Sequence, residues 1–67
     1  MTPDTLRAVG EALYGLRWQT PLAHDVGVND RTMRRWLAGT NPMPEGLQAD
    51  LRAIVKNRIK ALSHLMV

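Results

Sequence analysis

Three arginines that stand close together, Arg31, Arg34 and Arg35, are the residues whose chemistry is easiest to interpret. The planar guanidinium group donates two parallel hydrogen bonds, which fits the edge of a guanine base, and it also binds phosphate. The acidic residues of the chain are scattered instead of clustered. The cluster therefore indicates contact with nucleic acid, and the simpler alternative is a solvated helix face.

The composition narrows the kind of nucleic acid. The chain has 67 residues, room for one domain, and we expect residues 1–67 to form it. Nine Lys and Arg against six Asp and Glu give a formal net charge of +3, which weakly favours a polyanionic partner. Two Trp, one Tyr and no Phe argue against a stacking platform for single-stranded bases. Double-stranded DNA is the expected partner.

The residue types of the chain give little support for a catalytic site or a metal-binding site. The chain has no Cys, no Ser-His-Asp spacing and no glycine-rich phosphate loop. His24 stands beside Asp25, but adjacent helical side chains point about 100° apart and are not expected to face each other. We therefore expect no enzyme, no catalytic residue, no metal and no cofactor.

The hydropathy pattern predicts where in the cell the protein is found. No apolar run approaches the ~18 residues of a membrane span, and residues 1–4 lack the features of a secretory signal. We expect a cytoplasmic protein without membrane association. So small a chain also leaves little volume for a pocket, and no small-molecule effector is expected.

Pro and Gly divide the chain into four helical segments, with no alternation typical of a strand. The first begins at Thr2-Pro3-Asp4, a cap followed by Pro and an acid. Gly10 weakens this helix, and Gly15 lies near its end. Its expected buried face consists of Leu6, Val9, Leu13 and Leu16.

Pro and Gly residues also mark the bounds of the later segments. The second begins with Thr20 as cap and Pro21, and the third runs from the cap Asn29 to Gly39. The fourth is expected over residues 44–66. The predicted fold class is therefore all-α: a compact four-helix domain with a central helix-turn-helix and a long C-terminal helix.

Residues 19–38 meet the requirements of the helix-turn-helix. Ala23 is small where the two helices approach, and Gly27 permits a positive φ in the turn. On a helical wheel, Met33 and Trp36 fall opposite the three arginines, so burial of one face would present the other to solvent. The residues expected to fill the core of this unit are Leu22, Val26, Val28, Met33 and Trp36, with Trp18 beside them.

The stretch from Gln19 to Ala23, followed by residues 27–39, resembles the helix-turn-helix of small Cro/C1-type phage and bacterial regulators. A similar compact plan occurs in the anti-CRISPR-associated regulators of phages, which control their own operons. Members of the Cro/C1-type family are mostly operator-binding repressors, commonly dimers on inverted repeats. This chain departs from the usual form, because one long helix replaces two shorter helices after Gly39.

The resemblance implies two sets of DNA contacts. Gln19 and Thr20 would touch the phosphate backbone. The residues that would read bases in the major groove are Asn29, Asp30, Arg31, Thr32, Arg34 and Arg35. Asn29 and Asp30 also have local roles, as a helix cap and as an acid in the first turn.

The fourth segment has more apolar surface than closing one small core requires. About 20 helical residues span roughly 30 Å, the diameter of a small domain. A homodimer interface explains the surplus, and a membrane-surface helix is the alternative. The residues expected in that interface are Ile54, Val55, Ile59, Leu62, Leu65 and Met66.

These observations together predict a sequence-specific DNA-binding transcriptional regulator. We expect a dimeric repressor of its own operon that binds an inverted repeat through residues 29–38. One alternative is an antitoxin-like or adaptor protein-interaction module, for which the three arginines would be dispensable. Another is an excisionase-type recombination accessory, which would bind directly repeated sites.

Overall fold

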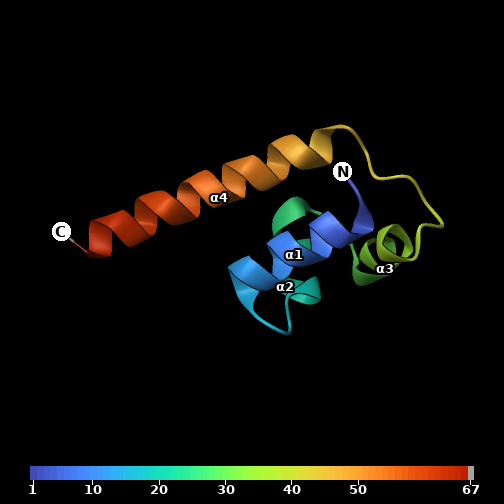
Figure 1. The fold of residues 1–67 in the computed structure, drawn as a ribbon, viewed down its shortest axis with the longest axis horizontal. Coiled ribbons are helices and arrows are strands. Elements are labelled where there is room, and N and C mark those ends of the chain that lie inside the picture. The colour runs from blue at the N-terminus through green and yellow to red at the C-terminus, as the bar shows by residue number, and fades with distance from the viewer. Residues whose placement is uncertain (67) are drawn as a thin grey trace.

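A computed structural model describes residues 1–66, so Val67, the last residue of the predicted domain, lies outside the described part. Residues 1–66 contain no strand and form four helices: α1 (Pro3–Tyr14), α2 (Gln19–Val26), α3 (Asp30–Ala38) and α4 (Gly46–Leu65). Helices α1, α2 and α3 gather into a cluster, and α4 runs across it and beyond (Figure 1). The predicted all-α, four-helix fold is confirmed.

The core is shared by all four helices. Trp18 directly precedes α2 and Trp36 lies on α3, and both are buried as expected. Helix α4 contributes buried side chains only from its first half. The buried apolar residues are Leu6, Trp18, Leu22, Ala23, Met33, Trp36, Leu47 and Leu51.

Two helices begin at residues other than those predicted. Helix α2 starts at Gln19, so Thr20 is inside its first turn instead of capping it. The cap position belongs to Trp18, which makes no side-chain capping bond because its indole is in the core. Helix α4 starts at Gly46, two residues after the predicted start at Pro44.

Leu16 lies outside the core, contrary to the predicted α1 face, since 93% of its surface is exposed. Leu13 is half-buried and does not belong to the core cluster. Helix α1 ends at Tyr14, and Gly15 adopts a positive φ of 83°. The chain therefore turns away before Leu16 can extend the helical repeat. Leu6 is fully buried and Val9 packs against the core, as the periodicity predicts.

The second half of α4 projects from the helical cluster (Figure 1). Every residue from 59 to 66 is exposed, and we call these residues the α4 arm. The projection lengthens the molecule to 44 × 23 × 19 Å. The radius of gyration of 12.4 Å accordingly exceeds the roughly 11 Å of a compact chain of this length. None of the helices in residues 1–66 combines the length and apolarity needed to cross a bilayer.

Candidate nucleic-acid interface

Helix α3 turns its basic side chains to solvent because its apolar side chains are anchored in the core. Met33 is fully buried and Trp36 is 4% exposed. Arg31, Arg34 and Arg35 are all exposed, and the small Ala38 is exposed among them. The opposed apolar and basic faces lie as the helical wheel predicts.

Both ends of α3 are capped by its own sequence. The Asn29 side-chain oxygen accepts a hydrogen bond of 2.8 Å from the backbone N–H of Thr32. At the other end Gly39 is left-handed, with a φ of 76°, and the N–H of Thr40 donates to the carbonyl of Arg35 at 3.1 Å. This is the Schellman arrangement, which satisfies carbonyls at a helix C-terminus. The capped helix holds its basic side chains on a defined backbone.

The turn between α2 and α3 depends on Gly27. Its φ is 78°, in the left-handed region, and a Cβ added there would meet nothing within 4 Å. Backbone conformation, not space, therefore requires glycine at this position. The N–H of Val28 donates to the carbonyl of Ala23 at 2.9 Å, which closes α2 and sends the chain directly into α3. Ala23 itself is buried, as expected where two helices approach closely.

The starts of α2 and α3 lie side by side. The Thr20 hydroxyl donates to the Asp30 carboxylate at 3.4 Å, so one predicted phosphate contact touches one predicted base contact. Gln19 and Asn29 are exposed at the same two helix starts. Thr32 differs from the other predicted base contacts because it is half-buried. The structure thus brings the two predicted phosphate contacts next to the first of the predicted base contacts.

A polar cluster that joins α1, α2 and α4 was missed by reasoning from sequence. The Tyr14 hydroxyl donates to the Asp25 carboxylate, and the Arg58 guanidinium lies 5.2 Å from the centroid of the Tyr14 ring. Arg58 also donates to the carbonyl of Leu13 at 2.9 Å. Burial and the bond to Asp25 raise the pKa of Tyr14 to about 12, and the same bond lowers the pKa of Asp25. The sequence did hold a signal for Arg58, because it follows Leu47, Leu51 and Ile54 at steps of four, three and four residues and so falls on the core-facing side of α4.

His24 and Asp25 approach each other, contrary to expectation, with 3.5 Å between Nδ1 and Oδ1. Their Cα–Cβ bonds diverge, but exposed side chains can still meet by choosing suitable rotamers. Asp25 is therefore shared between a histidine and Tyr14. Among residues 1–66, no group of three or more His, Cys, Asp or Glu side chains is placed to hold a metal ion.

The predicted dimer residues divide into two groups. Ile54 packs against the core of its own chain, and Val55 is half-buried between α1 and α4. The remaining four lie on the arm or at its tip, with exposed fractions between 51% and 85%: Ile59, Leu62, Leu65 and Met66. The surplus apolar surface is thus concentrated on the α4 arm.

Comparisons with known proteins find no counterpart, because no family model, no curated protein and no solved structure matches this chain. The functional conclusion therefore rests on geometry and chemistry alone. The relevant geometry is a short, capped helix with an anchored apolar face and an exposed arginine face, next to a second helix start.

Proposed function

We propose that this chain is a sequence-specific double-stranded DNA-binding transcriptional regulator. The observation that carries the proposal is the two-sided character of α3. Met33 and Trp36 anchor one face, and three exposed arginines cover the other. An α-helix fits the major groove of B-DNA, about 12 Å wide, and arginine bound to guanine is the commonest specific contact there.

The start of α2 supplies the proposed contacts with the phosphate backbone. Gln19 and Thr20 are exposed in its first turn, where backbone N–H groups and the helix dipole favour a phosphate. Phosphate contacts position a protein on the duplex, and base contacts specify the sequence. The hydrogen bond between Thr20 and Asp30 links the phosphate contacts of α2 to the base contacts of α3. The phosphate contacts would therefore fix which base pairs α3 faces.

The proposal includes a homodimer that binds an inverted repeat and represses its own operon in the cytoplasm, where phage and bacterial DNA is transcribed. One recognition helix covers only a few base pairs, which gives too little discrimination for one site in a genome. Two-fold pairing places two such helices in successive major grooves, about 34 Å apart. The exposed apolar arm of α4 supports a pairing surface of this kind.

The test begins with selection of preferred sites from random duplex DNA. Alanine at Arg31, Arg34 or Arg35 should weaken binding to the selected site by about 1–3 kcal/mol, roughly 5- to 150-fold, for each residue that reads a base. The base preference at one position of each half-site should relax at the same time. Lys60→Ala is the matched control, because it removes one positive charge from the arm.

The outcomes separate the competing functions. Wild-type affinity in all three arginine variants would overturn a reading role for α3. An antitoxin-like or adaptor module, which the exposed arm could also serve, predicts that no duplex is enriched. An excisionase-type accessory predicts enrichment of direct repeats instead of inverted ones.

A further inference from the structure

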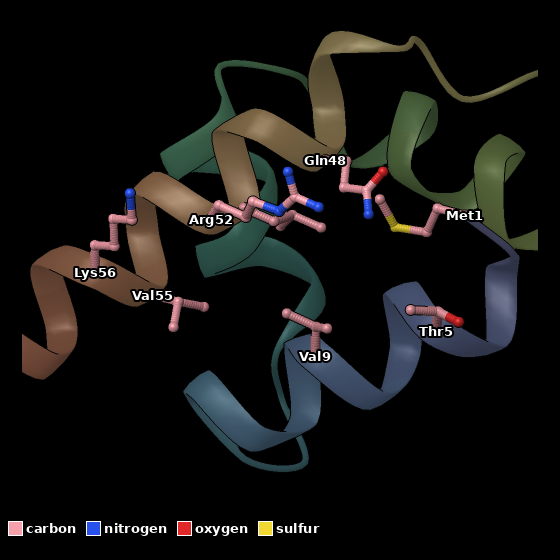
Figure 2. A pocket seen from close by; sticks show the side chains of 8 residues that line it. Met1, Thr5, Val9, Gln48, Arg52, Val55 and Lys56 are labelled. Atoms are coloured by element: carbon pink, nitrogen blue, oxygen red, sulfur yellow. The ribbon is translucent and has the colours of Figure 1, made fainter.

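A groove of about 530 Å³ opens between α1 and α4 (Figure 2). Val9 points up from α1 and Val55 points down from α4, so both side chains face the space between the two helices (Figure 2). Leu51 adds to the apolar lining, and the cationic side chains of Arg52 and Lys56 also line the groove. The groove therefore has an apolar interior next to positive charge.

The apolar side of the groove continues along the α4 arm. Val55, Ile59, Leu62 and Met66 follow one another at spacings of four, three and four residues, which keeps them on one helix face. Leu62 is 51% and Met66 85% exposed, because the arm extends past the other helices (Figure 1). A single apolar stripe is thus part groove lining and part uncovered helix.

We propose that a second copy of this chain covers the whole stripe. The two α4 helices run antiparallel about a two-fold axis, and the arm of each copy lies in the α1–α4 groove of the other. This inference rests on the dimer of the proposed function and specifies its interface. An acidic peptide or a lipid in the groove would leave the arm exposed, whereas a second copy covers both surfaces.

The lengths of arm and groove agree. The groove follows α4 from Gln48 to Lys56, which is about 12 Å at 1.5 Å per residue. The arm from residue 59 to residue 66 covers about 10 Å on the same scale. In an antiparallel pair the tip of the arm therefore reaches the end of the groove formed by Gln48 and Thr5.

The arm carries the cation Lys60 and the groove is lined by the cations Arg52 and Lys56, so the pairing must keep these side chains apart. The C-terminal end of a helix carries a partial negative charge from its unsatisfied carbonyl groups. Antiparallel pairing brings that end of α4 to Arg52, which lines the groove of the other copy. Lys60 points away from the apolar stripe by its helical position and would stay in solvent.

Sedimentation of the full chain tests the arrangement. Thr5→Trp should fill the groove from an exposed position on α1, and Leu62→Lys should place a charge on the arm. We expect each change to raise the dimer dissociation constant at least tenfold. Glu11→Trp, which is exposed on α1 outside the groove, is the matched control and should dimerise like the wild type.

Two results of that experiment would overturn the inference. One is a wild-type chain that stays monomeric at all concentrations. The other is a Thr5→Trp variant that dimerises normally while Leu62→Lys does not, because the arms would then pair without the groove.

A cross-linking experiment avoids dependence on disruptive variants. The chain has no cysteine, so a Thr5→Cys, Met66→Cys double variant introduces the only two thiols. Mild oxidation should link two copies of the double variant and neither single variant. A folded, dimeric double variant that forms no link would contradict the antiparallel arm-in-groove arrangement.

Duplex binding measured on the same samples separates this inference from the proposed function. A dimeric wild type with no affinity for any duplex would contradict the proposed DNA binding but not the proposed dimer interface. A monomeric wild type that binds selected duplex DNA would do the reverse. Leu62→Lys monomers should keep weak non-specific binding, because their α3 is unchanged.

Discussion

Gly10 lies in the middle of α1, where glycine costs roughly 1 kcal/mol of helix stability relative to alanine. The structure explains its presence. A Cβ at this position would lie 2.1 Å from a ring atom of Trp18. Glycine therefore lets the indole pack directly against the backbone of α1, and Trp18 is left only 3% exposed.

Gly10→Ala should consequently lower the free energy of unfolding by about 1–3 kcal/mol, as overpacking a core does, despite the better helix propensity of alanine. Gly46→Ala at the start of α4 is the control, because a Cβ there meets nothing within 4 Å. Urea unfolding of both variants checks the comparison. A Gly10→Ala variant about 1 kcal/mol more stable than wild type would mean that Trp18 shifts at no cost, because only the gain in helix propensity would remain.

At the scale of helices, Arg58 is the residue that ties the middle of α4 to the end of α1. Helix α1 has no basic residue in its own last turn. Arg58 supplies that charge by donating to the Leu13 carbonyl, near the negative end of the α1 dipole. Its guanidinium also faces Tyr14, whose hydroxyl reaches Asp25 on α2. The direction of α4 is therefore set by this polar cluster as well as by Leu47 and Leu51.

Tyr14→Phe should lower the free energy of unfolding by about 1 kcal/mol at neutral pH, because it removes the bond to Asp25. The pKa of Tyr14 in the folded chain, about 12, lies above the ordinary 10.0, so its contribution is complete below pH 10 and is lost as the pH rises toward 12. The pKa of Asp25 is lowered from 3.8, so the contribution is also lost as the pH falls below that value.

Urea unfolding of wild type and Tyr14→Phe at acidic, neutral and alkaline pH measures this dependence. The stability difference should be largest between about pH 4 and pH 10 and should shrink on both sides. A difference that stays constant over the whole range would show that Tyr14 and Asp25 are not bonded in solution.

At the scale of the whole molecule, the basic face of α3 and the start of α2 predict a strong dependence of DNA affinity on salt. The logarithm of affinity should fall by about 0.9 for each neutralised phosphate per tenfold increase in salt. A dimer that neutralises about six phosphates would thus show a slope near −5. Titrations at several salt concentrations give the slope, and the Leu62→Lys monomer should show about half of it. An affinity that hardly responds to salt would argue against DNA as the partner.

The sequence by itself determined the helix-turn-helix because every signal in that unit acts over a few residues. Asn29 caps the helix that it precedes, and Gly27 and Gly39 end helices by adopting a left-handed conformation next to them. The spacing of Met33 and Trp36 decides which face of α3 is buried and therefore which face carries the arginines. These effects need no knowledge of the other helices, so pattern and propensity were sufficient except at the start of α2, where the buried Trp18 and not Thr20 occupies the cap position.

Only the tertiary structure decided what depends on how distant helices pack. The glycine at position 10 is explained by the indole of Trp18 that packs against it. The role of Arg58 is explained by its hydrogen bond to the carbonyl of Leu13, 45 residues earlier in the chain. The exposure of Leu16 and the groove beside Val55 likewise follow from where α1 stops and how α4 crosses it. Helical periodicity shows which side chains share a face, but it does not show which neighbour covers that face or where the cover ends. The packing of the core determines both which neighbour covers a face and where the cover ends, and it leaves the α4 arm outside.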